Sequence, residues 1–183
     1  MLEKCKPLFL YFRFKVRTSI TEFVEENCEL EIQYFSNHEE RLVAMEMMNL
    51  EIESGLSWPF EEEFSDFASF SRYFMSHSAF VARVKNFKEK SVEFQEALPH
   101  GVVGCFYVKP NFPGRCSHVC NGGFIVKKEA RYNGIGQKMG TAFLPLARNL
   151  GYSASFFNLV FVSNGVRYGI IKIKVKSKSS PHS

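Results

Sequence analysis

The stretch from Val119 to Leu150 changes its residue pattern twice, and this constrains the fold more than any other feature of the chain. An apolar run, VCNGGFIVKK, is followed by the loop RYNGIGQ, in which two glycines flank one isoleucine. Helical spacing follows in GQKMGTAFLPLARNL, although we expect Pro145 to kink this helix or limit it to a short first section. The pattern predicts a strand, a glycine turn and a helix in succession.

Four other segments have the residue pattern of β-strands. They are residues 12–17, 78–86, 101–110 and 153–164. We expect the second and third to pair antiparallel. The last is apolar enough to be buried on both faces of a sheet. In the apolar run VCNGGFIVKK, the Gly-Gly pair indicates a bulge or a close approach by another backbone or a ligand.

Two segments before residue 75 have helical spacing. The first covers 39–55, places Leu42, Met45 and Ile52 on one face, and ends at Gly55. The second starts near Pro59 and carries a stripe of phenylalanines, at positions 60, 64, 67, 70 and 74. Helices and strands together predict a mixed α/β fold, organised as a single domain over residues 1–183.

Composition excludes several classes of protein. With 183 residues, 45% of them hydrophobic, the chain can bury a sizeable core. The net charge of +4 is too small to indicate a nucleic-acid partner. No apolar run approaches the roughly 18 residues of a membrane helix. Five cysteines, an odd number, indicate reduced thiols, so we expect a cytoplasmic protein, with a mitochondrial location left open.

The loop between strand and helix has the chemistry of an anion site. Backbone N–H groups at a helix N-terminus point outward, and the glycines at 134 and 136 let phosphate oxygens approach them. Arg131 can add a full positive charge. The loop is not a P-loop, because the Gly-Lys-Ser/Thr ending is missing. It also does not match the dinucleotide-binding fingerprint, because the third glycine falls at the wrong spacing and no acidic residue follows the next strand.

The order Arg-x-x-Gly-x-Gly between a strand and a helix resembles the pyrophosphate loop of the GNAT superfamily of acetyl-CoA-dependent N-acetyltransferases. The segments NLEIESG, FYVKPNFPGRCSHVCNGGF and FFNLVFVSN are similar to fungal acetyltransferases that detoxify proline analogues such as azetidine-2-carboxylate. The resemblance covers about residues 49–164. It implies a GNAT-like α/β fold, acetyl-CoA as co-substrate, a small amino acid as acceptor, and no metal.

The resemblance also implies roles for individual residues. The strand residues Phe124, Ile125 and Val126 would pair with the pantetheine arm of acetyl-CoA. The loop amides would bind the pyrophosphate, and they belong to Arg131, Tyr132, Asn133, Gly134, Ile135, Gly136 and Gln137. Asn121 and Asn158 would hold the acceptor's carboxylate and orient its amine. A water near Asn164, or a backbone carbonyl, would take the amine proton.

Several alternatives remain at these positions. Asn158 in an apolar strand either has a structural hydrogen-bond partner or faces a site. Asn121 beside Gly-Gly also has the character of a turn residue. Period two would place Cys116, His118 and Cys120 on one side of a strand, but no second cluster completes a metal site. Cys105 has no identifiable His and acid pair, so we interpret it as a structural thiol.

The acceptor and the C-terminus leave further alternatives. The loop alone does not identify the acceptor, so a polyamine or a protein terminus is an alternative, as is a non-catalytic protein that binds CoA. A homodimer is also left open. The resemblance stops after Asn164, where the divergent basic tail 165–183 begins. From this we expect a domain incomplete at its C-terminus, with marginal stability, self-association and weak activity.

Overall fold

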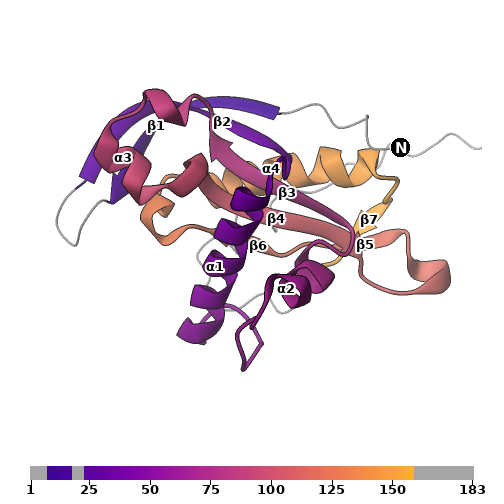
Figure 1. Ribbon diagram of the computed structural model, residues 1–183. Helices are drawn as coiled ribbons and strands as arrows, with labels where there is room; N and C mark the ends of the chain where they lie inside the picture. The colour runs from indigo at the N-terminus through magenta and orange to yellow at the C-terminus, as the bar shows by residue number, and fades with distance from the viewer. Residues whose placement is uncertain (1–7, 18–22, 159–183) are drawn as a thin grey trace, which may run out of the picture.

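The computed structural model describes residues 8–17 and 23–158, with side chains described from Asn27 to Asn158. The chain forms one mixed sheet with helices on both faces (Figure 1). The strands are β1 (Leu8–Arg17), β2 (Phe23–Tyr34), β3 (Ser78–Val84), β4 (Val102–Pro110), β5 (Val119–Asn121), β6 (Phe124–Val126) and β7 (Ala154–Ser155). The α-helices are α1 (His38–Ser54), α2 (Phe67–Phe74), α3 (Val92–Ala97) and α4 (Ile135–Asn149). The predicted α/β fold is confirmed.

The sheet has the order β1-β2-β3-β4-β5-β7. β6 also pairs with β4, in the same register as β5 and in line with it. All pairs are antiparallel except β5 with β7, which run parallel. The predicted pairing of β3 with β4 is therefore confirmed, with Phe80 opposite Phe106. Asn164, the end of the predicted last strand and the tail 165–183 lie outside the described residues.

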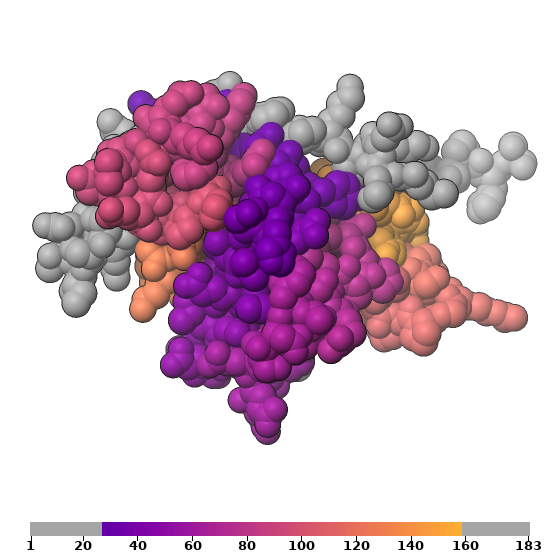
Figure 2. Space-filling view, in the orientation of Figure 1, coloured from indigo at the N-terminus to yellow at the C-terminus, as the bar shows by residue number. Residues whose placement is uncertain are grey.

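Each face of the sheet has its own apolar core, because side chains alternate along every strand. Phe80 and Phe106 pack with α4 residues such as Phe143 on one face. Val81 and Tyr107 pack against α1 and α2 on the other. Figure 2 looks onto this second face, where α1 and α2 cover the sheet at the centre of the view.

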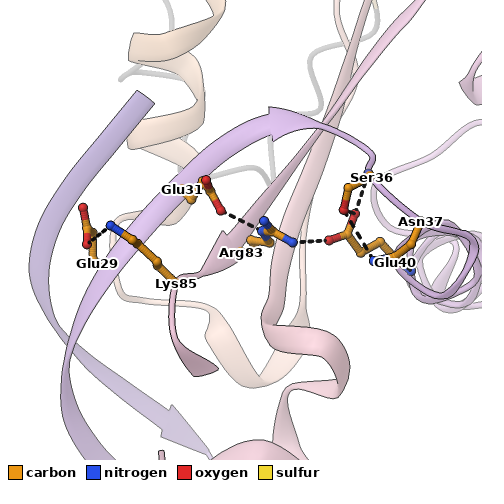
Figure 3. A network of polar contacts seen from close by, with 7 residues as sticks. All are labelled: Glu29, Glu31, Ser36, Asn37, Glu40, Arg83 and Lys85. Atoms are coloured by element: carbon orange, nitrogen blue, oxygen red, sulfur yellow. Dashed lines mark hydrogen bonds and ion pairs between the residues drawn. The ribbon is translucent and has the colours of Figure 1, made fainter. Parts of the chain in front are cut away.

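A polar network ties the start of α1 to the middle of the sheet (Figure 3). Asn37 caps the helix, since its Oδ1 accepts from the Glu40 N–H at 2.8 Å. The buried Glu40 carboxylate accepts from the Ser36 N–H at 2.9 Å and from Arg83 at 2.8 Å. Arg83 also donates to Glu31 at 2.8 Å. The guanidinium of Arg83 therefore lies between two carboxylates.

The first predicted helix has the predicted end, and Met45 and Ile52 of its predicted apolar face pack in the core, but Leu42 does not. It ends at Gly55, whose φ of 65° is the left-handed conformation that favours glycine. Leu42 is 40% exposed, whereas Ile52 is buried as predicted. The buried positions recur at threes and fours along a neighbouring stripe, and they are Glu40, Val43, Ala44, Met47, Met48 and Ile52. Leu42 lies outside that stripe.

The second helix begins later in the sequence than predicted. It begins at Phe67, not near Pro59, and Asp66 caps it by accepting from the Ser69 N–H at 2.7 Å. Asn49 of α1 holds the preceding chain out of helical conformation, because its carboxamide bonds both the N–H (3.0 Å) and the carbonyl (3.1 Å) of Phe64. Phe60 and Phe64 still pack against the core from this loop.

The last two predicted elements also differ from the structure. Helix α4 runs without interruption from Ile135 to Asn149, so Pro145 does not shorten it. Burial of Met139, Phe143 and Leu146 on the sheet stabilises the helix beyond the proline. In the described part of the chain, the predicted strand 153–164 is only the two residues of β7, and Phe156 is 58% exposed instead of buried.

Within the described ranges, no helix has both the length and the apolar character that crossing a bilayer requires.

Candidate active site

The predicted anion loop lies between β6 and α4. Gly134 precedes the first helical residue with a φ of 70°, and no side chain caps the helix there. The first-turn amides of an α-helix have no carbonyl partner within the helix. The N–H groups of Ile135, Gly136 and Gln137 therefore point out of the N-terminus of α4, where the helix dipole adds partial positive charge. This is the backbone arrangement that binds phosphate.

Side chains around the loop are arranged differently from the prediction. Arg131 pairs with Glu51 of α1 and donates to the Val126 carbonyl at 3.3 Å. Its charge is therefore shared with a carboxylate. Lys138 lies closer to the turn, since a Cβ built on Gly134 would be 3.7 Å from Lys138 Nζ. Lys138 adds a cation to this helix end that the sequence prediction missed.

The sheet splits beside this loop. β5 has β4 on one side and β7 on the other. β6 continues the line of β5 along β4, yet within the described residues β4 is its only strand partner. β7 therefore pairs with β5 and not with β6. The Val126 carbonyl on this edge accepts from Arg131, but the edge has no strand partner among the described residues, so an extended ligand can form hydrogen bonds with its remaining N–H and carbonyl groups.

Two glycines separate β5 from β6. The pairing register with β4 is the same on both sides, and the Tyr107 N–H donates to the Gly123 carbonyl at 3.2 Å. The bulge expected there is therefore wrong, because no extra residue is inserted. Close packing requires the glycines instead. A Cβ on Gly122 would lie 2.5 Å from the Phe143 ring, and one on Gly123 would lie 2.6 Å from the Trp58 ring.

The two asparagines predicted to bind the acceptor differ in their hydrogen bonds. Asn121 Oδ1 accepts from the Gly122 N–H at 2.8 Å, so its Nδ2 donors point away and have no acceptor among the described residues. The exposed Asn158 forms a two-way amide pair with Asn111, donating at 2.6 Å and accepting at 3.4 Å. In the described part of the chain, no hydrogen bond joins Asn121 to Asn158. The substrate role of both residues remains a prediction.

Beside Asn121 lies a group that the sequence analysis missed. Lys109 is directly opposite Asn121 in the β4–β5 pair. Its Nζ lies 4.0 Å from the centre of the Tyr73 ring and 4.3 Å from that of Tyr107. The two hydroxyls are 3.3 Å apart. We call Trp58, Tyr73, Tyr107, Lys109 and Asn121 the Lys109 cluster.

Burial affects ionisation within the Lys109 cluster. It lowers the pKa of Lys109 below its ordinary value of 10.5. Burial, assisted by the hydrogen bond with Tyr73, raises the pKa of Tyr107, so its phenol stays protonated. The Trp58 indole N–H is buried without a hydrogen-bond partner among the described residues.

The exposed loop after β4 projects next to this end of the sheet, at the right of Figure 2.

The cysteines and His118 do not form a second site. Cys116 ends a short 3-10 helix, Gly114–Cys116, so the expected placement of Cys116, His118 and Cys120 on one strand is wrong. Within residues 8–17 and 23–158, no three metal-ligating side chains cluster. Burial raises the pKa of the Cys105 thiol, which keeps it protonated and unreactive.

The sequence of this chain is similar to that of a known N-acetyltransferase. No family model matches the sequence. Over 132 residues, the chain is 35% identical to the N-acetyltransferase aca1 of Schizosaccharomyces pombe, and the match covers 70% of this chain and 63% of aca1. The chain therefore spans less than two thirds of that relative.

Solved structures share the fold. A GCN5-related N-acetyltransferase from Kribbella flavida aligns with a TM-score of 0.55 and 17% identity over 69% of each chain. The yncA protein of Salmonella typhimurium, solved with its cofactor acetyl-CoA, aligns with a TM-score of 0.55 and 10% identity over 70% of this chain and 68% of yncA. The chain therefore has the fold of the GNAT acetyltransferases. Its GNAT fold contains both the split sheet and the glycine turn before α4.

Sequence reasoning predicted one half of this candidate site and missed most of the other. The strand, turn and helix of the phosphate loop are contiguous, so a local pattern was sufficient to predict them. Lys109, Tyr73 and Trp58 belong to three separate segments. Only the alternation within FYVKP gave a signal, since it places Tyr107 and Lys109 on one face of a strand.

Proposed function

We propose that this chain is an acetyl-CoA-dependent N-acetyltransferase that acetylates the amine of a small amino acid, a proline analogue such as azetidine-2-carboxylate. One observation carries the proposal: the edge of β6 that has no strand partner among the described residues is followed, after the short 3-10 helix Lys128–Ala130 and the glycine turn, by the uncapped N-terminus of α4. This arrangement offers an extended arm a strand edge and offers a diphosphate a set of backbone amides. Both features lie within the GNAT fold.

In this proposal, the main chain of β6 and the turn before α4 bind different parts of acetyl-CoA. Phe124, Ile125 and Val126 would pair with the pantetheine arm through their main chain. The amides of the turn, from Arg131 to Gln137, would hold the pyrophosphate, with Lys138 beside them. In this arrangement Arg131 positions the loop, because its guanidinium already pairs with Glu51.

The reaction needs few side chains for chemistry. Bound acetyl-CoA supplies an acetyl thioester, so the acceptor nitrogen forms a bond to the acetyl carbon, the carbon–sulfur bond breaks, and the amine proton leaves with CoA as the free thiol. The protein holds the two reactants in line and excludes competing orientations. Asn121 presents N–H donors toward the acceptor. The role of Asn164 as the site of a bridging water lies outside the described residues.

Other acceptors fit this site less well. A polyamine or a protein N-terminus brings positive charge, which carboxylates would attract. The side chains nearest Asn121 are a lysine and aromatic rings. The ammonium group of Lys109 favours an acceptor that carries a negative charge.

Acetyl transfer to a panel of amines tests the proposal. The full chain is incubated with acetyl-CoA and azetidine-2-carboxylate, proline, spermidine or an N-terminal peptide, and released thiol is measured. We expect azetidine-2-carboxylate to have the highest kcat/KM. Binding of acetyl-CoA without thiol release on any amine would identify a non-catalytic CoA-binding protein. Preference for spermidine or the peptide would overturn the acceptor assignment.

A further inference from the structure

We infer that Lys109 binds the carboxylate of the acceptor, with Asn121 as a second donor, and that this ion pair selects amino acids over uncharged or cationic amines. The inference rests on the proposed function and deepens it, since it assigns the group that recognises the acceptor. The sequence pattern placed this lysine on one face of a strand with Tyr107 but did not indicate a binding role. The structure assigns it through four observations.

The first observation is the absence of a partner acid. Lys109 is only partly exposed, and among the described residues no carboxylate and no carbonyl bonds its ammonium group. Its neighbours are the faces of Tyr73 and Tyr107. Ring faces attract a cation less strongly than a hydrogen-bonded carboxylate does. The ammonium therefore retains the capacity to bind an anion.

The second observation is the alignment of Lys109 with Asn121. Directly opposed residues of antiparallel strands project to the same face, with Cβ atoms about 4.5–5.5 Å apart. The Gly122 N–H donates to Asn121 Oδ1, which fixes the carboxamide so that Nδ2 is the free end. Lys109 and Asn121 thus present only hydrogen-bond donors. A carboxylate accepts hydrogen bonds and so binds to such a pair of donors.

The third observation concerns the indole of Trp58. Its ring lies against Gly123, two residues after Asn121 in sequence. Its N–H is buried and has no hydrogen-bond partner in the described part of the chain. The atom nearest Gly123 is Cη2 of the six-membered ring, not Nε1, so Trp58 borders the Lys109 cluster with an apolar edge.

The fourth observation is the position of the Lys109 cluster relative to acetyl-CoA. The chain runs from Asn121 through Gly122–Gly123 along β6 and then into the turn before α4. With the pyrophosphate at that turn and the arm along β6, the thioester lies toward the glycine pair. Asn121 immediately precedes this glycine pair, and Lys109 lies opposite Asn121 on β4. An acceptor held there by its carboxylate places its amine near the acetyl group.

The test compares two acceptors that differ in charge. Azetidine-2-carboxylate and its neutral carboxamide are assayed with saturating acetyl-CoA, using the wild-type chain, Lys109→Met and Lys109→Arg. Lys85→Met is the matched control, because it removes a lysine that already pairs with Glu29 at 3.0 Å. Melting temperatures and the KM for acetyl-CoA are measured for every variant.

We expect Lys109→Met to raise the KM for the acid about 10- to 100-fold, since a charge-assisted hydrogen bond contributes about 1.5–3 kcal/mol. The KM for the carboxamide and for acetyl-CoA should not change. Lys109→Arg should recover part of the loss, and Lys85→Met should behave as wild type. Equal losses for both acceptors, or no loss for the acid, would overturn the inference.

Failure of the proposed function gives a different result. If the wild-type chain acetylates neither compound, the acid is titrated into the wild-type chain and Lys109→Met by calorimetry. Binding that is lost only in Lys109→Met supports the carboxylate site without the reaction. Equal binding, or no binding to either protein, contradicts it.

Discussion

Two cations on neighbouring strands of the sheet have opposite surroundings. Arg83 on β3 donates to Glu31 and to the buried Glu40, each at 2.8 Å (Figure 3). Lys109 on β4 has two aromatic rings and an amide donor beside it, and no carboxylate among the described residues. A cation that the fold has already paired contributes to structure. A partly buried cation with no carboxylate partner among the described residues can still bind an anion.

The same comparison extends to Arg131 in the phosphate loop. Its guanidinium pairs with Glu51 and so resembles Arg83 more than Lys109. We therefore assign pyrophosphate binding mainly to backbone amides and assign loop positioning to Arg131. Neutralising each of these cations should give a different pattern of stability and binding.

The largest effect is expected at Arg83. Arg83→Met leaves the carboxylate of Glu40, which is 1% exposed, without its cation. We expect unfolding free energy to fall by about 3 kcal/mol, at the lower limit for a broken buried pair because Arg83 itself keeps 28% exposure. Urea denaturation measures the loss. A stability equal to wild type would show that the network in Figure 3 does not stabilise the fold.

The next effect is expected at the start of α4. At Gly136 a side chain projects toward the helix N-terminus, where the phosphates would bind. We expect Gly136→Val to weaken acetyl-CoA binding by about 30-fold, or about 2 kcal/mol, with little change in melting temperature. Calorimetry with acetyl-CoA checks it. Gly134→Val is a poorer probe, because the φ of 70° would strain valine.

A smaller effect is expected from Arg131→Gln. Its pair with Glu51 is partly exposed, and pairs of this kind contribute about 0.2–1 kcal/mol. We expect acetyl-CoA affinity to fall by less than about fivefold. A loss as large as that of Gly136→Val would move Arg131 from a positioning role to direct phosphate binding.

The smallest effect is the pH dependence of stability at Lys109. Because burial lowers its pKa in the folded protein, the contribution of Lys109 to folding is complete only above 10.5 and is lost as the pH falls through the folded pKa. The wild-type chain should therefore gain stability relative to Lys109→Met as the pH rises from 7 toward 10.5. Paired thermal melts measure this difference. An opposite trend would indicate a partner anion for Lys109 within the protein.

Sequence patterns predicted those parts of the fold that depend on neighbouring residues. The strand, glycine turn and helix around Gly134 follow from local periodicity and backbone freedom. The start of α2 did not, because Asn49 fixes Phe64 through hydrogen bonds across 15 positions of sequence. The amide pair of Asn111 with Asn158 spans 47 positions and could not be predicted from either segment alone.

The candidate site divides in the same way. Its cofactor half uses backbone groups, and the requirement for glycine at a turn appears directly in the sequence. Its acceptor half uses side chains that the sheet brings together from α2, β4 and β5. Lysine and tyrosine are common on strands, so their types alone do not indicate a site.

Mass spectrometry of the acceptor gives the most direct test of the proposed reaction. The full chain is incubated with acetyl-CoA and azetidine-2-carboxylate, and the N-acetylated product and free CoA are both quantified. We predict equal amounts of the two products, with formation reduced in both Gly136→Val and Lys109→Met. Release of CoA without N-acetylated amino acid, or no release by the folded wild-type chain, would contradict the proposed reaction.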